Sequence, residues 1–421
     1  MSISATFERL PVHSPLESFE GKAWAPAPAS AGVTEGYAAS RATNGKKPHV
    51  CFLAPTTWPV LTGSSDIKVV GGAEVQQSMI MPALAKRGYK VSMISLDYGQ
   101  PDRAEVQGIT VHKMYKPDEG IPVLRFLHPR LTSLWSALKR VDADVYYQRT
   151  AAINTAVMAE FCHRHGKKSI YAGASDVDFL PGEEDIRYAR DRRIFQHGVR
   201  RVDKVITQNA AQRQTLLDNY GRDSTVIQSC YVPRPGAKAD RAGYVLWVAS
   251  VRPSKRVELM LEIARRLPDH PFVIIGGPDA GRKDIEYFES LRAVAATLPN
   301  VKMLGFMPFA QAEEYFNGAR VFVNTSLYEG FPNTFMQAWA RGIPSVGFVD
   351  TGSRRDGQPI YDIVNDVSDA TAKVERLMRD DILWQQASNR VAAHFRDCHS
   401  IDAVIDRYEH ELASCSGGGT R

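Results

Sequence analysis

The sequence predicts an α/β protein with two doubly wound domains, each a parallel sheet covered by helices. A chain of 421 residues is too long for one ordinary hydrophobic core. From Pro48 onward, short apolar runs of strand type alternate with segments of helical spacing. This alternation stops at Val232–Gly243, where VPRPGAKADRAG has no apolar period, and then starts again. We therefore expect one domain over residues 48–235 and a second over residues 236–399, facing a central cleft.

The first domain is expected to follow a flexible tail. Residues 1–47 are rich in Ala, Ser, Pro, Gly and Thr and have few large apolar groups, so burial cannot repay the entropy of ordering them. The apolar runs that follow predict strands at His49–Ala54, Lys90–Leu96, Ile109–Met114, Asp144–Tyr147, Ser169–Tyr171, Lys204–Thr207 and Val226–Cys230.

The second domain repeats the pattern, and its first helix predicts a buried stripe. Apolar residues recur there at steps of three and four, at Val257, Met260, Leu261, Ala264 and Leu267. Strands are expected at Tyr244–Ala249, Phe272–Ile275, Val301–Leu304, Val321–Asn324 and Ser345–Phe348. Residues 400–413 contain a last helix, Ile401–Leu412. In one interpretation, this helix packs back on the first domain. Residues 414–421 are expected to be a flexible tail.

Composition narrows the class of protein. The 52 Lys+Arg and 47 Asp+Glu residues give a net charge of +5, spread along the chain, which does not indicate a nucleic-acid-binding protein. Five scattered cysteines without a CxxC pair are typical of a reduced, cytoplasmic protein. No apolar run reaches the ~18 residues that span a bilayer, and no secretory signal begins the chain. Two interpretations stay open for Arg125, Phe126, Leu127, Arg130 and Trp135: a peripheral contact at the inner face of the membrane, or a buried helix.

Gly71 and Gly72 are the first candidate ligand contacts. They stand between the long connection Pro55–Val70 and a helix. Glycine lets a backbone approach a ligand closely, and connections of this length are typically functional or disordered. Ordinary turn punctuation is the alternative.

A cationic segment, SVRPSKR, follows the first strand of the second domain. Arg252 and Lys255 stand where α/β sheets bind ligands, and they can neutralise a diphosphate leaving group as its negative charge builds. Cations at a helix start oppose the helix dipole, so a solvated helix start is the weaker interpretation.

Small residues follow the next two strands. Gly277 in IGGP and Met307 in GFMP are candidates to line a donor site, although turn chemistry alone also explains them.

The most informative segment, NTSLYEGFPNTFMQAWA, runs from a strand through a Gly/Pro loop into a helix. Glu329 stands in the loop, where a carboxylate can accept hydrogen bonds from sugar hydroxyls. A helix that begins near Asn333 or Thr334 would direct its amide groups at a phosphate. Thr334 as a mere helix cap is the alternative. The expected donor contacts from this segment are Gly330, Phe331, Pro332, Asn333, Thr334 and Gln337.

From Pro48 to about Leu412 the chain resembles the retaining glycosyltransferases of family 4. The segment EGFPNTFMQAWARGIP resembles the family's E-x7-E motif, and VASVRPSKR stands in the place of its diphosphate-binding Arg and Lys. The resemblance implies the GT-B fold of two Rossmann-like domains, the first binding the acceptor and the second the nucleotide sugar. It also implies that Glu329 holds the transferred sugar, that Arg252 and Lys255 bind the donor diphosphate, and that Gly72 backs the phosphates.

Two positions depart from the family pattern. The second glutamate of the motif, which usually bonds the donor ribose, is Gln337 here. Gln keeps an acceptor oxygen, so contact with the ribose can survive the loss of charge. Many relatives have a His after the fifth strand, where this chain has AGASDVD, so Asp176 either contacts the sugar or acceptor or lies in a loop that caps the next helix.

The resemblance implies a same-face transfer from a UDP- or GDP-linked sugar to a glycan or lipid-linked acceptor, with no protein nucleophile, metal or other cofactor. Cell-surface polysaccharide or glycoconjugate synthesis is the usual setting of the family. The alternative is a catalytically impaired relative that binds nucleotide sugar within an assembly complex. A nicotinamide-dependent oxidoreductase is disfavoured, because the first strand leads into Pro55-Thr56-Thr57-Trp58 rather than GxGxxG.

Overall fold

The computed structural model describes residues 47–63, 71–117, 119–120, 127–234, 243–278, 282–327, 329 and 331–416. Three residues with a predicted role, Arg125, Phe126 and Gly330, lie outside these ranges, as does most of the two predicted tails. In the part of the chain described, no helix is both long and apolar enough to cross a membrane.

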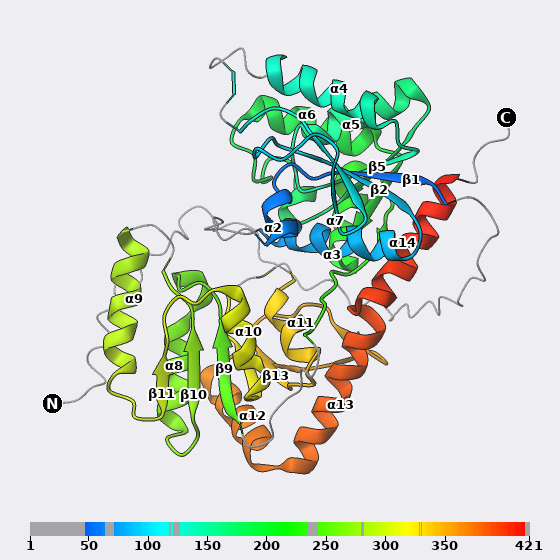
Figure 1. Cartoon of the computed structure of the whole chain (residues 1–421). Helices are drawn as coiled ribbons and strands as arrows, with labels where there is room; N and C mark the ends of the chain where they lie inside the picture. Colours follow the sequence, from blue (N-terminus) through cyan, green and yellow to red (C-terminus); the bar gives the residue numbers. More distant parts are fainter. Residues whose placement is uncertain are drawn as a thin grey trace. The chain divides into compact units, whose positions relative to one another are not determined.

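The first sheet has eight strands in the order β3-β4-β2-β1-β5-β6-β7-β8. Its strands β1, β2 and β5 are labelled in Figure 1. All neighbours pair in parallel except β3 and β4. The strands are β1 His49–Leu53, β2 Lys90–Ser95, β3 Ala104–Val106, β4 Ile109–Lys113, β5 Val145–Arg149, β6 Lys168–Ala172, β7 Lys204–Thr207 and β8 Thr225–Val226.

Helices cover both faces of this sheet. Successive side chains of a strand point to opposite faces, so the buried strands present apolar residues on both sides. Val50 and Phe52 of β1 enter one core, and Cys51 and Leu53 enter the other. The connecting helices are α2 Trp58–Thr62, α3 Gly72–Lys86, α4 Thr132–Val141, α5 Asn154–His165, α6 Ala189–Arg201 and α7 Ala210–Tyr220, with a π-turn at Leu127–Leu131 and a 3-10 turn, η4, at Asp176–Phe179. Trp135 of α4 packs against the second core, which favours the buried-helix interpretation of that residue.

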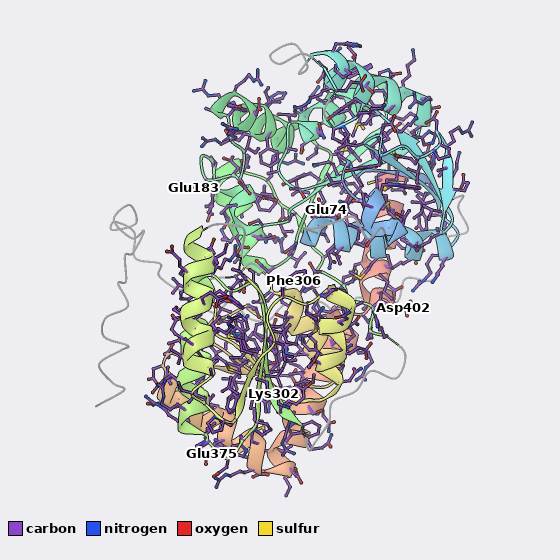
Figure 2. All side chains as sticks on the ribbon, turned by 60° about the vertical axis from the view of Figure 1, so that its left-hand side comes forward. Glu74, Glu183, Lys302, Phe306, Glu375 and Asp402 are labelled. Atoms are coloured by element: carbon purple, nitrogen blue, oxygen red, sulfur yellow. The ribbon has the colours of Figure 1, made fainter. Side chains whose placement is uncertain are left out.

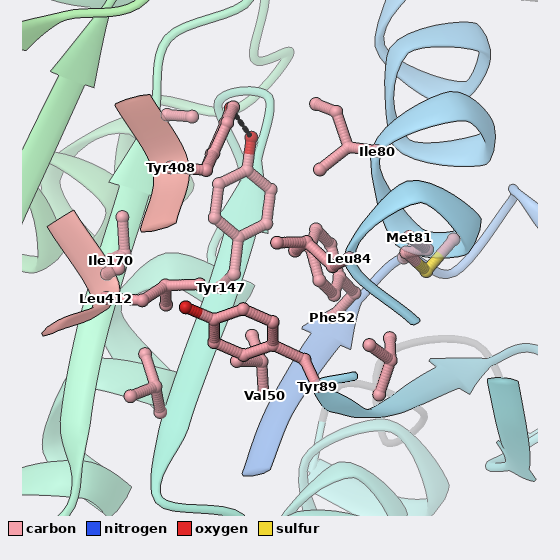
Figure 3. Close-up of a cluster of buried hydrophobic side chains, with 14 of the residues drawn as sticks. Val50, Phe52, Ile80, Met81, Leu84, Tyr89, Tyr147, Ile170, Tyr408 and Leu412 are labelled. Carbon is pink, nitrogen blue, oxygen red and sulfur yellow. Dashed lines mark hydrogen bonds between the residues drawn. The ribbon is translucent and has the colours of Figure 1, made fainter. Parts of the chain in front are cut away.

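The last helix, α14 Ile401–Ser416, completes the core of the first sheet. Tyr408 and Leu412 are buried in the same cluster as Val50 and Phe52 (Figure 3). The hydroxyl of Tyr408 lies 3.1 Å from that of Tyr147 on β5, within hydrogen-bond distance. The C-terminal segment of the chain is thus part of an N-terminal hydrophobic core.

The second sheet has six strands, all parallel, in the order β11-β10-β9-β12-β13-β16. They are β9 Tyr244–Val248, β10 Phe272–Ile275, β11 Val301–Met303, β12 Ala319–Asn324, β13 Ser345–Gly347 and β16 Asp362–Ile363. A small hairpin pairs β14 Arg354–Arg355 with β15 Gln358–Pro359. The helices are η5 Pro253–Lys255, α8 Val257–Arg266, α9 Arg282–Ala295, α10 Phe309–Asn317, α11 Asn333–Trp339, α12 Val367–Arg379 and α13 Asp381–Cys398.

The predicted stripe of α8 is confirmed, since all of its residues are buried in one core of this sheet. The predicted strand Val226–Cys230 is wrong, because β8 ends at Val226. After that point, side chains of other elements replace a strand neighbour. The amide of Cys230 donates to Oε1 of Gln76, and the Ser229 carbonyl bonds Nδ1 of His399 at 2.8 Å.

Candidate functional site

The loops after β9 and β12 meet, because these strands are parallel neighbours and their carboxyl ends lie at the same edge of the sheet. The β9 loop carries Arg252 and Lys255, and the β12 loop carries Glu329. Nζ of Lys255 forms an ion pair with Oε1 of Glu329. Both side chains are largely buried, at 10% and 15% exposure, so the pair is shielded from bulk water. The structure thus joins two of the residues on which the sequence analysis rests.

Side chains beside the pair tie the two loops together. Oγ1 of Thr325 donates to the Lys255 carbonyl at 2.6 Å and accepts from Nε1 of Trp247 at 2.9 Å. The Arg256 guanidinium donates to the carbonyls of Thr325 and Ser326 at 2.8 and 3.0 Å. Sequence analysis gave these four residues no role. Arg256, Thr325 and Ser326 lie within the two motifs, whereas Trp247 belongs to the predicted strand before the first motif. The bonds of all four residues depend on the pairing of β9 and β12.

The carboxylate of Glu329 is held at one oxygen. Oγ of Ser326 donates to Oε1 at 2.6 Å, and Lys255 bonds the same atom. Among the described residues, Oε2 receives no hydrogen bond. A carboxylate held in this way can offer its second oxygen to a ligand hydroxyl.

Arg252 lies on the same short loop. It immediately precedes η5, is exposed, and its carbonyl accepts from the Lys255 amide at 2.8 Å. The backbone of Arg252 therefore lies directly before the short helical turn that contains Lys255.

Gly277 lies against the β9 loop. Its carbonyl accepts from the Val251 amide at 2.8 Å. A Cβ at position 277 would lie 2.7 Å from Cβ of Phe306, so only glycine leaves room for that residue. Phe306, labelled in Figure 2, is 77% exposed. The next residue, Met307, packs partly into the core. Donor contacts by Gly277 and Met307 remain a prediction.

Helix α11 begins at Asn333, as the sequence predicted. The cap position is Pro332, with no side-chain cap bond, so the interpretation of Thr334 as the helix cap is wrong. Gln337 is buried on this helix. The ring of Phe331 packs against that of His399 in a tilted arrangement, with centroids 4.7 Å apart, which anchors the start of the segment.

The two glycines at the start of α3, Gly71 and Gly72, have different surroundings. A Cβ on Gly71 would lie 2.2 Å from Oε2 of Glu74, whose other oxygen accepts from Oγ1 of Thr56 at 2.7 Å. A Cβ on Gly72 would meet Asn333 alone, at 3.5 Å from Nδ2. The structure therefore brings Gly72 next to the predicted donor helix, and assigns Gly71 the packing of Glu74, which sequence analysis missed.

Asp176 opens η4 after β6. It is exposed, and Oδ1 accepts from Nε2 of Gln212 at 2.8 Å. The nearby Asp178 is a buried acid, and its Oδ2 accepts from the Tyr171 hydroxyl and the Ala174 amide. Burial raises the pKa of Asp178. No hydrogen bond in the described chain joins Asp176 to Lys255 or Glu329, so its role in catalysis remains a prediction.

Both halves of the chain match known families. Residues 70–231 match the family described as Glycosyltransferase Family 4, and residues 242–380 match Glycosyl transferases group 1. The chain belongs to the family 4 type of glycosyltransferases. Arg252, Lys255, Glu329 and Gln337 of this glycosyltransferase all lie within the second matched segment.

Its relatives are distant. D-inositol 3-phosphate glycosyltransferase of Mycolicibacterium smegmatis (strain ATCC 700084 / mc(2)155) is 25% identical over 247 residues, which are 52% of this chain and 55% of the relative. The chain therefore spans about half the length of that curated relative.

Solved structures of low identity share the fold. Sucrose-phosphate synthase from Thermosynechococcus elongatus has a TM-score of 0.66 at 15% identity, over 88% of this chain and 99% of that one. Anabaena HepE in complex with UDP has a TM-score of 0.63 at 16% identity, over 87% of this chain and 100% of that one. The glycosyltransferase therefore has the GT-B fold, with two Rossmann-like sheets.

Proposed function

We propose that the chain is a retaining glycosyltransferase that moves a sugar from a UDP- or GDP-linked donor to a glycan or lipid-linked acceptor, in cell-surface polysaccharide or glycoconjugate synthesis. The observation that carries the proposal is the buried ion pair between Lys255 and Glu329, with Arg252 on the same loop. Ligands of doubly wound sheets bind at the carboxyl ends of the strands, where this pair lies.

In the proposed reaction, the bond between the anomeric carbon and the phosphate oxygen of the donor breaks as the acceptor oxygen attacks from the same face. The acceptor proton passes to an oxygen of the leaving nucleotide diphosphate. Negative charge therefore grows on the diphosphate, and Lys255 and Arg252 stabilise it. Because no protein nucleophile takes part and attack comes from the departing side, the configuration of the sugar is retained.

Glu329 is assigned to the transferred sugar. Its Oε1 is fixed by Ser326 and Lys255, so Oε2 can accept from sugar hydroxyls. Lys255 has three N–H donors and can keep Glu329 in place while it contacts a phosphate oxygen. One buried cation thus orients the sugar-binding group and neutralises the leaving group.

The donor nucleotide is assigned to the side of α11. Gln337 is buried there, and its amide can bond ribose hydroxyls. HepE was solved with UDP, which makes uridine donors the first to test. The Mycolicibacterium relative is named for D-inositol 3-phosphate, so a phosphorylated polyol belongs in the acceptor panel beside glycans and lipid-linked sugars.

Transfer assays on the purified full chain test the proposal. UDP- and GDP-sugars are screened for binding by thermal shift, because a ligand that binds only the folded state raises the melting temperature. Turnover is then measured with each acceptor, and the anomeric configuration of the product is read by NMR. Glu329→Ala and Lys255→Ala are each expected to lower kcat/KM by about 100-fold or more.

Matched controls come from the same half of the chain, Lys302 from β11 and Glu375 from α12. Lys302→Ala and Glu375→Ala make the same changes at residues outside the site, both labelled in Figure 2, and should keep full activity. Unchanged turnover in Glu329→Ala and Lys255→Ala would refute the assignment. Nucleotide binding without turnover on any acceptor would instead support the catalytically impaired alternative.

A further inference from the structure

A cavity lies on the first sheet, in a different part of the fold from the loops of β9 and β12. Its volume is about 210 Å³, and its walls come from β1, β2, β4, the chain before β3 and the end of α4. Five of its lining residues carry the inference: His49, Lys90, Arg103, His112 and Arg140.

Strand register places these residues on one face of the sheet. His49 of β1 pairs with Lys90 of β2, and His112 of β4 pairs with Ile94, four residues further along β2. Side chains an even number of residues apart point to the same face of a strand. Three strands therefore contribute to the face that α4 covers, and α4 supplies Arg140 from its last turn.

The walls bring three cations together without an acid. Lys90, Arg103 and Arg140 line the pocket, and no carboxylate does. The pKa values of the two histidines that line the pocket are lowered as well. Burial and then Lys90 lower the pKa of His49 to about 4. Burial lowers the pKa of His112, and Arg140 and Arg103 lower it further.

The carboxylates outside the walls are Asp102, Glu105, Asp142 and Asp144. Glu105 accepts from the hydroxyl of Thr110, which itself lines the pocket, at 2.7 Å. Asp142 pairs with Lys167 at 2.7 Å, and Asp144 accepts from the His49 amide at 2.8 Å. Asp102 lies 3.9 Å from Arg140, at the outer limit of an ion pair. The positive charge of the pocket is therefore only partly compensated by the protein itself.

His112 needs a partner that the described protein does not supply. The residue is 6% exposed, and its Nδ1 is buried without a hydrogen bond. An unsatisfied buried polar group costs about 1–3 kcal/mol. His49, by contrast, lies 2.8 Å from Oγ of Ser92 through Nε2. His112 lines the pocket, so an imidazole ring borders the space that the three cations surround.

We propose that this pocket binds a phosphate group, carried by a small metabolite or by a lipid head group. Guanidinium forks and an ammonium are the groups that recognise phosphate oxygens, and an imidazole N–H adds a further donor. The volume is below the ~300 Å³ of the smallest drug-sized ligand sites, which fits a compact anion. The site belongs to the first sheet alone, so it does not depend on the proposed transfer reaction.

Thermal melts of the full chain test the site with inorganic phosphate against sodium chloride at equal ionic strength. Lys90→Gln and Arg103→Asn each remove one charge from an exposed position, and Asn suits the left-handed backbone of residue 103, whose φ is 59°. Phosphate should raise the melting temperature of the native chain, and each variant should need at least fivefold more phosphate for the same rise.

Lys139→Gln is the matched control, because Lys139 is an exposed neighbour of Arg140 outside the pocket. It should respond like the native chain, and phosphate bound near Lys255 would shift all of these proteins alike. Cosedimentation with phosphatidylcholine vesicles, with and without phosphatidic acid, identifies a lipid source if binding needs the acid and is lost in both pocket variants. Equal responses of all variants to phosphate and to vesicles would overturn the proposal.

Discussion

Thr325 is the single side chain on which the geometry of Lys255 depends most directly. Its hydroxyl donates to the Lys255 carbonyl and accepts from the Trp247 indole, both in the buried interior. Thr325→Val keeps the shape but leaves a donor and an acceptor unpaired, at about 1–3 kcal/mol each. We expect urea unfolding to show a loss of about 2–6 kcal/mol, together with reduced turnover.

Thr371→Val is the control for that change. The Thr371 hydroxyl on α12 donates to the Val367 carbonyl at 2.7 Å within its own helix. That carbonyl belongs to a helical turn and keeps a backbone partner, so the loss should stay within about 0.5–1 kcal/mol. If both valine variants lose the same stability, the coupling through Thr325 does not exist.

Two buried histidines near the α13–α14 junction, His399 and His394, should make the protein less stable in acid. Burial lowers the pKa of His399 to about 3 and that of His394 to about 4, from 6.5. Between these values the unfolded chain binds more protons, so this stability is complete above about pH 6.5 and falls as the pH decreases. From pH 7 to pH 5, each residue should cost about 2 kcal/mol in the free energy of unfolding.

The measurement is urea unfolding at pH 7 and pH 5 in variants. His399→Asn keeps an N–H donor for the Ser229 carbonyl and should reduce the fall by about 2 kcal/mol. His394→Asn should act alike, and serves if the first variant does not fold. His163→Asn, exposed on α5, is the control and should keep the full pH dependence. An identical fall in all four proteins would show that other groups cause it.

At the scale of the element, sequence analysis succeeded where burial is continuous. The apolar runs of β1, β2 and β10 are buried almost throughout and were found within one or two residues. β3 and β16 were missed because strands of two or three residues are too short to show a hydrophobic period. β5 continues to Arg149, two residues beyond the predicted end, since a buried Gln and Arg complete it and polar residues do not signal a strand.

Helix α14 gives the prediction at this scale. Leu412 is 2% exposed and lies in the core of the first sheet. Leu412→Ala removes buried methyl groups and leaves a cavity, so the free energy of unfolding should fall by about 2–5 kcal/mol. Leu217→Ala on α7 is the matched control, because Leu217 is 46% exposed and should cost much less. Equal losses in the two variants would contradict the packing of α14 described here.

For the whole molecule, the sequence predicted the main residues of the site but not the hydrogen bonds that hold them. Glu329 and Lys255 were predictable because each follows a strand, and the carboxyl ends of parallel strands converge. Trp247, Thr325 and Arg256 were not predictable, since their hydrogen bonds exist only once β9 and β12 lie side by side. The phosphate pocket was missed for the same reason: Lys90, Arg103 and Arg140 come from β2, the chain before β3 and the end of α4, and only the folded sheet with its helix brings them together.

The contribution of α14 to the first sheet predicts that this half of the chain cannot fold normally alone. A fragment of residues 1–234 lacks Val404, Ile405, Tyr408 and Leu412, so the apolar face that they cover would meet water. We expect the fragment to bind an apolar dye and to unfold without a cooperative urea transition. Fusing residues 400–416 to its end through a flexible Gly/Ser linker should restore cooperativity, whereas the same fusion carrying Tyr408→Asp and Leu412→Asp should not. A fragment that unfolds cooperatively without α14 would show that the core of the first sheet is complete before the C-terminal helix arrives.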